Sequence, residues 1–149
     1  MTVLLWLWII LLGTAFGAGL YESRVVVPLW TSAPPASLAV PDAGRRFWAL
    51  ITTGPLTLVT IANLVLALRS DGPPSSRAWW LTAAAVTVVE RVMTFGYFIP
   101  TIIRLARQAQ NTPAMQAALT RWVRLNYVRN ALTLVAWVAA LKVLSVVRV

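Results

Sequence analysis

Residues 121–141, RWVRLNYVRNALTLVAWVAAL, place Asn126, Arg129 and Asn130 inside a run that is otherwise apolar enough to cross a bilayer. One stripe of this expected helix collects Trp122, Asn126, Arg129, Thr133 and Trp137, with Asn130 at its border. A guanidinium at the centre of the hydrocarbon costs roughly 2.5–3.5 kcal/mol on insertion scales. The stripe is therefore predicted to face other helices, where Arg129 needs a carboxylate partner.

The composition of the whole chain is that of a membrane protein. Of its 149 residues, 59% are hydrophobic and 11% are charged, whereas soluble domains carry about 25% charged residues. Cysteine and histidine are absent, which excludes disulfides, zinc centres, His-ligated haem and Glu-x-x-His di-iron sites. In a membrane protein the net charge of +9 indicates topology, so no nucleic-acid partner is expected.

Four apolar runs separated by Pro- and Gly-rich segments predict a single transmembrane domain over residues 1–149. The expected spans are 3–27, 47–68, 79–100 and 121–143, the first of them a retained helix and not a cleaved signal peptide. A bend is expected at Gly54-Pro55, and residues 104–120 are expected to form a polar, amphipathic connection. The predicted fold class is an all-α integral membrane four-helix bundle with both termini on the same side.

Tryptophans and arginines give the expected depth and orientation. Trp30, Trp48 and Trp122 would mark the level of the two longer loops, and Trp6, Trp8, Trp79 and Trp80 that of the termini and the short turn. Seven arginines lie near the longer loops, against three arginines and one lysine at the other end. The longer loops are therefore expected to be cytoplasmic. The Arg-, Ala- and Val-rich composition favours a bacterial cytoplasmic membrane.

Polar side chains inside the spans are expected at one depth, which predicts a site. Its predicted catalytic residues are Glu90, Arg129 and Asn126. Its predicted substrate-binding residues are Tyr21, Glu22, Arg24, Arg91, Tyr97, Trp122, Asn130 and Trp137. Glu22 and Arg24 lie on opposite faces of a straight helix, so the inward face of the first span stays open. No metal ligand set is expected.

Two other polar or small-residue features have structural interpretations. Asn63 lies away from the expected polar layer and is interpreted as an interhelical hydrogen-bonding residue. Gly13-x-x-x-Gly17 is interpreted as a helix-packing signal. The charges themselves have a structural alternative as well: Glu90 with Arg129, and Glu22 with Arg24 or Arg91, would be buried ion pairs that fix helix register.

Three segments carry a family resemblance: GAGLYESRVVVPLW (17–30), ERVMTFGYFIPTIIRL (90–105) and residues 121–141. Together they resemble the small four-helix membrane proteins of the anthrone oxygenase-like family, also known as DUF1772. The best part is a W-x-x-x-N-x-x-R pattern at Trp122, Asn126 and Arg129, with Pro28 and Pro100 in the other two segments. The resemblance implies an activity like that of fungal relatives, which oxidise polyketide anthrones to anthraquinones.

The resulting hypothesis is a membrane enzyme that oxidises an anthrone-like or other enolisable, lipophilic aromatic substrate with O₂, without a metal or other cofactor. Glu90 would be the base, Arg129 and Asn126 would hold the developing oxyanion, and aromatic side chains would hold the rings. The substrate would enter from the bilayer. The alternative is a non-catalytic membrane protein that binds a lipophilic small molecule or serves as a subunit of a larger complex. A homo-oligomer is left open.

Overall fold

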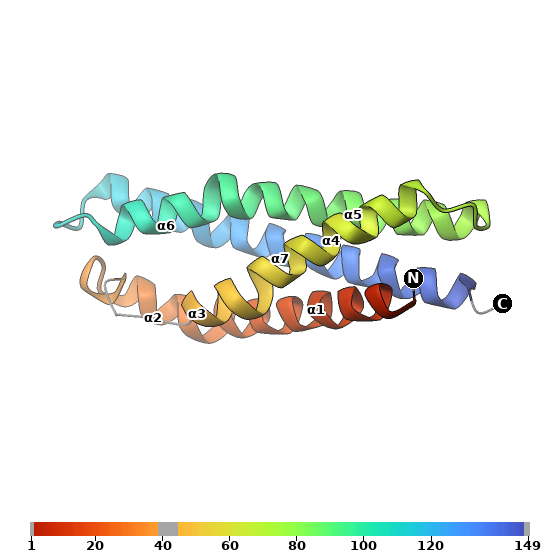
Figure 1. Ribbon diagram of the computed structural model, residues 1–149. Coiled ribbons are helices and arrows are strands. Elements are labelled where there is room, and N and C mark those ends of the chain that lie inside the picture. Colours follow the sequence, from red (N-terminus) through yellow and green to blue (C-terminus); the bar gives the residue numbers. More distant parts are fainter. Residues whose placement is uncertain (1, 39–44, 148–149) are drawn as a thin grey trace.

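The computed structural model describes residues 2–38 and 45–147, which form four long helical rods (Figure 1). The first rod comprises α1 (Thr2–Tyr21), η1 (Glu22–Val26) and α2 (Val27–Ser32), followed by a short 3₁₀ turn, η2 (Ala36–Leu38). The second comprises α3 (Arg45–Phe47), η3 (Trp48–Thr53) and α4 (Gly54–Leu68). The third comprises α5 (Pro74–Met93), η4 (Thr94–Phe98) and α6 (Ile99–Ala106). The fourth is the single helix α7 (Pro113–Val147).

Each rod is long and apolar enough to cross a membrane, so the predicted all-α four-helix membrane fold is confirmed. The candidate spans are Val3–Ser32, Trp48–Leu68, Pro74–Ala106 and Pro113–Val146. Both termini lie at the same end of the bundle (Figure 1). The expected connection over residues 104–120 is mostly helical, because α6 continues to Ala106 and α7 already begins at Pro113. Proline is favoured in the first turn of a helix, where its missing N–H has no helical partner to lose.

Three of the rods contain a π-helical turn directly before a proline. In each turn a backbone N–H donates to the carbonyl five residues earlier: Val27 to Glu22, Gly54 to Ala49, and Ile99 to Thr94. Pro28, Pro55 and Pro100 follow these donors. A proline ring would clash with the carbonyl four residues back in an α-helix, and a wider turn relieves that clash. The interruption predicted at Gly54-Pro55 takes this form.

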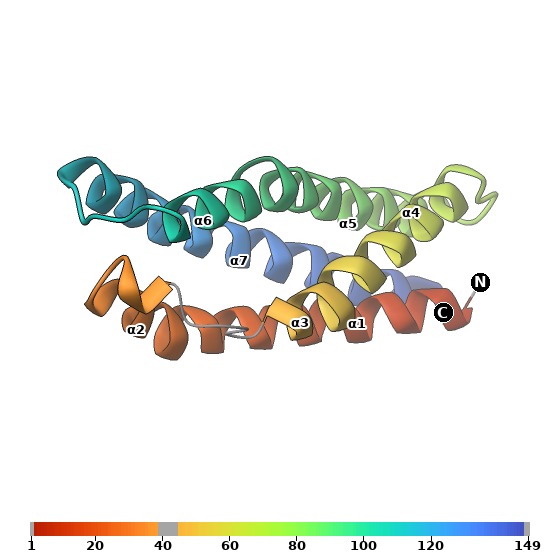
Figure 2. The same cartoon turned by 60° about the vertical axis from the view of Figure 1, so that its left-hand side comes forward.

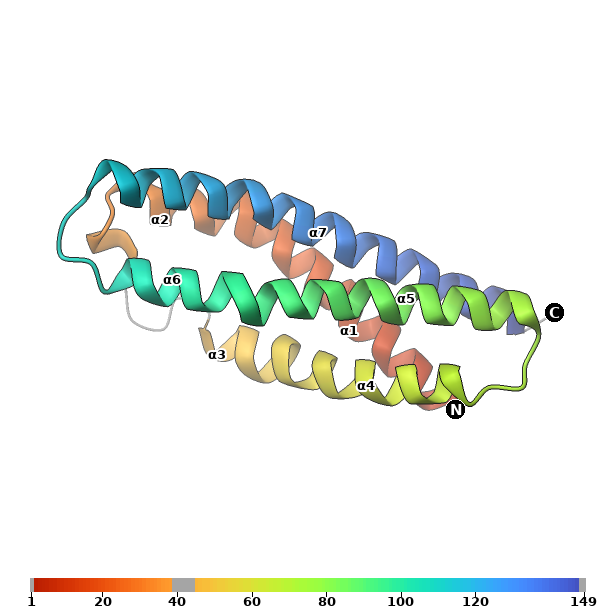
Figure 3. The same ribbon diagram turned by 90° about the horizontal axis from the view of Figure 1, so that it is seen from above.

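Among the described residues the rods enclose three clusters of buried apolar side chains, the largest of them formed by α1, α4, α5 and α7. α7 lies against α5 and α1, and α4 lies against α5 and α1 (Figures 2 and 3). Small side chains line the contact between α5 and α7, where Ala83, Ala84, Ala136, Ala139 and Ala140 are buried. Small residues let membrane helices approach closely. In Figures 1 and 2, α4 runs obliquely, from the level of α1 at its α3 end to the level of α5 at its other end.

A polar contact layer joins three helices near the termini. Trp80 Nε1 donates to Asn63 Oδ1 at 3.2 Å, and Asn63 Nδ2 donates to the Leu4 carbonyl at 3.2 Å. Trp8 Nε1 donates to Thr60 Oγ1 at 3.0 Å. The interhelical role predicted for Asn63 is confirmed. Trp8 and Trp80 are both buried against neighbouring helices, where their N–H groups find protein acceptors. Their expected depth, at the level of the headgroups, stays a prediction.

Candidate functional site

Four ionisable side chains from three rods meet inside the bundle: Glu22, Glu90, Arg91 and Arg129. The two carboxylates are 8% and 4% exposed and each arginine side chain is 11% exposed. Two acids and two bases give the group a net charge of zero. Because each charge has an opposite charge beside it, the group can be buried within a membrane-spanning bundle.

Arg129 is held on all sides by groups of the protein. Its Nη2 lies 3.3 Å from Glu22 Oε2, and its Nε lies 4.0 Å from Glu90 Oε1. Its guanidinium carbon stands 4.8 Å from the Phe98 ring centroid and 5.7 Å from that of Trp48. Cations within about 6 Å of an aromatic face are attracted to it. Arg129 therefore links all four rods, because Glu22, Trp48, Glu90 with Phe98, and Arg129 itself come from different ones.

Glu90 and Arg91 form the second half of the group. Arg91 Nε donates to Glu90 Oε2 at 2.5 Å, and Thr94 Oγ1 donates to Glu90 Oε1 at 3.0 Å. Arg91 Nη2 also lies 2.5 Å from Glu90 Oε2. Since each carboxylate oxygen has about two lone-pair positions, Oε1 keeps an unused one, whereas both positions of Oε2 face Arg91. The other end of Arg91 is different, because its Nη1 is buried without a hydrogen-bond partner among the described residues. Arg91 thus carries a free donor within the charged group.

A neutral polar seam joins η1 to α7 beside the charges. Ser23 Oγ accepts hydrogen bonds from Asn126 Nδ2 at 3.0 Å and Asn130 Nδ2 at 2.9 Å, and donates to the Gly19 carbonyl at 2.8 Å. Asn130 Nδ2 also reaches the Gly19 carbonyl at 3.1 Å. A Cβ at Gly19 would overlap Asn130 Oδ1, so the Asn130 side chain keeps this position only with glycine at residue 19. Asn126 Oδ1 is buried and unpartnered in the described part of the chain.

Most of the residues predicted for the site do come together. Glu22, Glu90, Arg91 and Arg129 form the charged group, and Asn126 and Asn130 form the seam. Trp122 lies next to this layer, since its Nε1 donates to the Phe98 carbonyl at 3.2 Å and its ring packs on Phe98 with centroids 5.4 Å apart. Tyr97 packs edge-on against Phe98 as well, at 5.3 Å.

Three predicted residues lie elsewhere. Tyr21 is 62% exposed and Arg24 is also exposed, because Glu22 and Ser23 occupy the inward face of this turn. Trp137 is packed against Phe16, with ring centroids 6.0 Å apart, and against Gly13. The packing role predicted for Gly13 holds, whereas Gly17 meets no neighbouring atom within 4 Å of an added Cβ.

The predicted set of site residues leaves out four residues of this layer: Ser23, Trp48, Thr94 and Phe98. For Ser23 a signal existed, because it follows Gly19 by one helical turn on the face that carries Ala15 and Glu22. Thr94 likewise follows Glu90 by one turn, and its hydroxyl bonds that carboxylate. Trp48 and Phe98 carry no such signal, since their contact with Arg129 depends on how three rods are placed in space.

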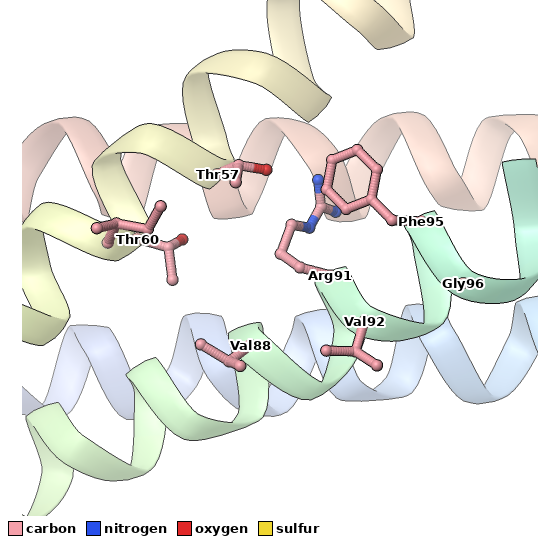
Figure 4. Close-up of a pocket in the computed structure, with 8 residues that line it drawn as sticks. Thr57, Thr60, Val88, Arg91, Val92, Phe95 and Gly96 are labelled. Atoms are coloured by element: carbon pink, nitrogen blue, oxygen red, sulfur yellow. The ribbon is translucent and has the colours of Figure 1, made fainter.

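A pocket of about 500 Å³ opens beside Arg91 on the outer side of the bundle, between α4 and the rod of α5 and η4 (Figure 4). It is lined by Thr57, Thr60, Ile61, Val88, Arg91, Val92, Phe95 and Gly96. Arg91 and Phe95 reach toward α4, whose Thr57 and Thr60 lie opposite (Figure 4). The oblique course of α4 leaves this space, and its volume lies within the roughly 300–1,000 Å³ of small-molecule sites.

The pocket faces the lipid. Ile61 and Val92 are 55% and 65% exposed on the bundle surface, where acyl chains surround a membrane-spanning helix. Thr57 and Thr60 each donate their hydroxyl hydrogen to a carbonyl of their own helix, at 2.6 Å in both cases. Arg91 is therefore the lining side chain with a hydrogen-bond donor to offer, and the rest of the lining is apolar or accepting.

Fold and site together define a four-helix membrane protein with a compensated charge group beside a lipid-facing pocket. A model of the anthrone oxygenase family matches residues 45–139, well over half of the chain. The chain belongs to the anthrone oxygenase family, as its sequence segments indicated. The matched range includes Glu90, Arg91, Asn126 and Arg129, and it begins after Glu22 and Ser23. No curated protein sequence and no solved structure matches this chain.

Proposed function

We propose that this protein oxidises an anthrone, or an enolisable lipophilic aromatic compound of the same chemistry, with O₂ as co-substrate. One observation carries the proposal: the Arg91 side chain, whose buried Nη1 has no hydrogen-bond partner among the described residues, lines a lipid-facing pocket and is paired with the buried Glu90 carboxylate. A base and an anion-binding group side by side in an apolar pocket suit proton abstraction next to a carbonyl-conjugated system. Membership in the anthrone oxygenase family supports the same chemistry.

The reaction balances without a further reactant. A methylene between two aromatic rings and conjugated with a carbonyl loses one proton and becomes a delocalised enolate. The enolate gives electrons to O₂ as a C–O bond forms, and protonation yields a hydroperoxide. Loss of water then breaks the O–O bond and the remaining C–H bond and leaves a new carbonyl. In sum, CH₂ and O₂ become C=O and H₂O.

The residues divide this work as follows. Glu90 accepts the proton, using a lone pair that neither Thr94 nor Arg91 occupies. Arg91 Nη1 holds the enolate oxygen, and a well-placed donor of this kind stabilises the transition state by roughly 3–4 kcal/mol. Arg129, expected from sequence to hold the anion itself, is already engaged by Glu22 and Glu90 and acts as a positioning residue for Glu90. Asn126, for which the same role was expected, has its amide nitrogen on Ser23.

We propose that this oxidation proceeds without a bound metal. Histidine and cysteine, the usual ligands of redox-active metals, do not occur in the sequence. Within residues 2–38 and 45–147, no three His, Cys, Asp or Glu side chains gather. The buried carboxylates Glu22 and Glu90 each face an arginine. The electrons must then come from the substrate, which an enolate supplies.

The origin of the new oxygen atom in the quinone tests the proposed oxidation. The purified protein in lipid nanodiscs is supplied with an anthrone and isotopically labelled O₂, and the quinone is analysed by mass spectrometry. One labelled oxygen atom per quinone is expected, because the second atom of O₂ leaves as water. Binding of the anthrone without faster quinone formation than in empty nanodiscs would contradict the proposal and favour the non-catalytic alternative.

We propose that the protein lies in a bacterial cytoplasmic membrane and that the end of the bundle with the longer loops faces the cytoplasm. Ser75 in the first turn of α5 and Asn111 in the connection between α6 and α7 are both exposed. These two connections lie at opposite ends of the bundle (Figure 1), and the chain has no cysteine of its own. Single cysteines at these two positions are therefore clean reporters. A membrane-impermeant thiol reagent added to intact cells is expected to label S75C and spare N111C. Labelling of N111C alone would reverse the orientation.

A further inference from the structure

We infer that Gly96 determines the size of the substrate, by leaving room for a fused three-ring system whose oxygen-bearing edge lies at Arg91. The nature of the ligand in this assignment rests on the proposed function. The assignment itself rests on the shape and chemistry of the pocket between α4 and η4.

The pocket has one charged lining residue, Arg91, and two threonines whose hydroxyls already donate to carbonyls of their own rod. Arg91 lines the pocket with a guanidinium side chain whose buried Nη1 has no hydrogen-bond partner among the described residues, whereas Val88, Val92 and Phe95 offer apolar surface. A ligand with an acceptor oxygen on one edge therefore satisfies the pocket when that edge lies at Arg91. Its opposite edge then lies between α4 and η4 and points toward the lipid, where Val92 is exposed. A planar, largely apolar ring system with an oxygen at one edge has this distribution of polarity.

Gly96 supplies space at the η4 side of this pocket. It lines the pocket five residues after Arg91, and a Cβ built there meets no atom within 4 Å. The space is thus unfilled by any neighbouring side chain, and a larger residue would project into it without displacing the protein. Phe95 and Val92, the lining residues nearest in sequence, already carry side chains there. A side chain at residue 96 would therefore take up part of the space that glycine leaves open beside the pocket.

Gly17 provides a matched control. It is also an exposed helical glycine whose added Cβ would meet nothing within 4 Å, but it lies on α1 and does not line the pocket. Gly96→Leu and Gly17→Leu therefore make the same chemical change on two lipid-facing surfaces. Gly96→Ala adds a graded step. Melting temperatures in detergent show that each variant is folded, and a small shift is expected because no contact is disturbed.

The test is equilibrium binding of two quinones, which resemble the product and do not turn over: anthraquinone with three rings and 1,4-naphthoquinone with two. Gly96→Leu is expected to weaken anthraquinone binding by roughly tenfold or more, the scale on which single methylene groups alter selectivity in apolar pockets. Binding of naphthoquinone should change less than about twofold, Gly96→Ala should lie between wild type and Gly96→Leu, and Gly17→Leu should match wild type.

Equal weakening of both quinones, no weakening of either, or a wild-type protein that binds neither would overturn the assignment. The outcome is independent of catalysis. If the variants show this size selection but the wild-type protein does not oxidise anthrone, the proposed function is refuted and the role of Gly96 stands. A protein that oxidises anthrone equally well with leucine at position 96 would do the reverse.

Discussion

Replacement of Glu90 by glutamine is expected to slow anthrone oxidation by about 10²- to 10⁴-fold, the usual contribution of a positioned general base. An amide keeps the size of the side chain and still accepts a hydrogen bond from Thr94, but it cannot take the methylene proton. The effect should fall on kcat, while the affinity for anthraquinone changes little, because Arg91 remains in the pocket. Initial rates of quinone formation at saturating anthrone measure it.

Asp71→Asn is the matched control, because this substitution also changes an acid to an amide. Asp71 lies exposed in the turn between α4 and α5. Its rate should equal that of wild type. If Glu90→Gln is as fast as wild type, proton abstraction by Glu90 is refuted. If Glu90→Gln instead loses anthraquinone binding with no loss of kcat, the carboxylate serves to orient Arg91 and not to move a proton.

Replacement of Arg129 by methionine is expected to lower the free energy of unfolding by roughly 3–5 kcal/mol, the usual effect of removing one partner of a buried ion pair. The change leaves Glu22 without a cation and removes the cation that Trp48 and Phe98 enclose. Arg124→Met is the control, because Arg124 lies exposed on the same helix. It should change stability by less than about 0.5 kcal/mol. Reversible unfolding in mixed detergent gives both values.

A double-mutant cycle then identifies the partner. Addition of Glu22→Gln to Arg129→Met should recover most of the lost stability, because no buried charge is then left alone. The same cycle with Glu90→Gln should show weaker coupling, since Arg129 lies 4.0 Å from Glu90 and 3.3 Å from Glu22, and Glu90 has Arg91 as its own partner. Strict additivity in the Glu22 cycle would show that this pair contributes nothing.

The sequence predicts which ionisable residues gather inside the bundle more reliably than it predicts which of them form ion pairs. Ionisable groups within hydrocarbon must find partners, so the gathering of Glu22, Glu90, Arg91 and Arg129 follows from the cost of leaving any of them in lipid. Which arginine pairs with which acid depends on the rotation and crossing of the rods. The sequence analysis paired Arg129 with Glu90, whereas the shorter contact of Arg129 is with Glu22.

The first span shows why one helical face was left open in the sequence analysis. Tyr21 and Arg24 share one face of the helix and Glu22 lies on the opposite face. A helical projection does not show which of these two faces points into the bundle. In the structure the Glu22 face points inward, and Gly19 leaves room on that face for the Asn130 side chain to bond the α1 backbone. The lipid-facing pocket could not be predicted from the sequence either. It exists because α4 diverges from α5 and because residue 96 has no side chain, and neither effect appears in the periodicity of a single span.

The most direct test of the proposed chemistry is O₂ uptake by purified protein that has been freed of metals with a chelator and supplied with an anthrone. We predict consumption of one O₂ per quinone formed, at a rate above that of empty nanodiscs and unchanged by added iron or copper. Activity that disappears on chelation and returns with one of these metals would contradict an oxidation driven by Glu90, Arg91 and the enolate alone.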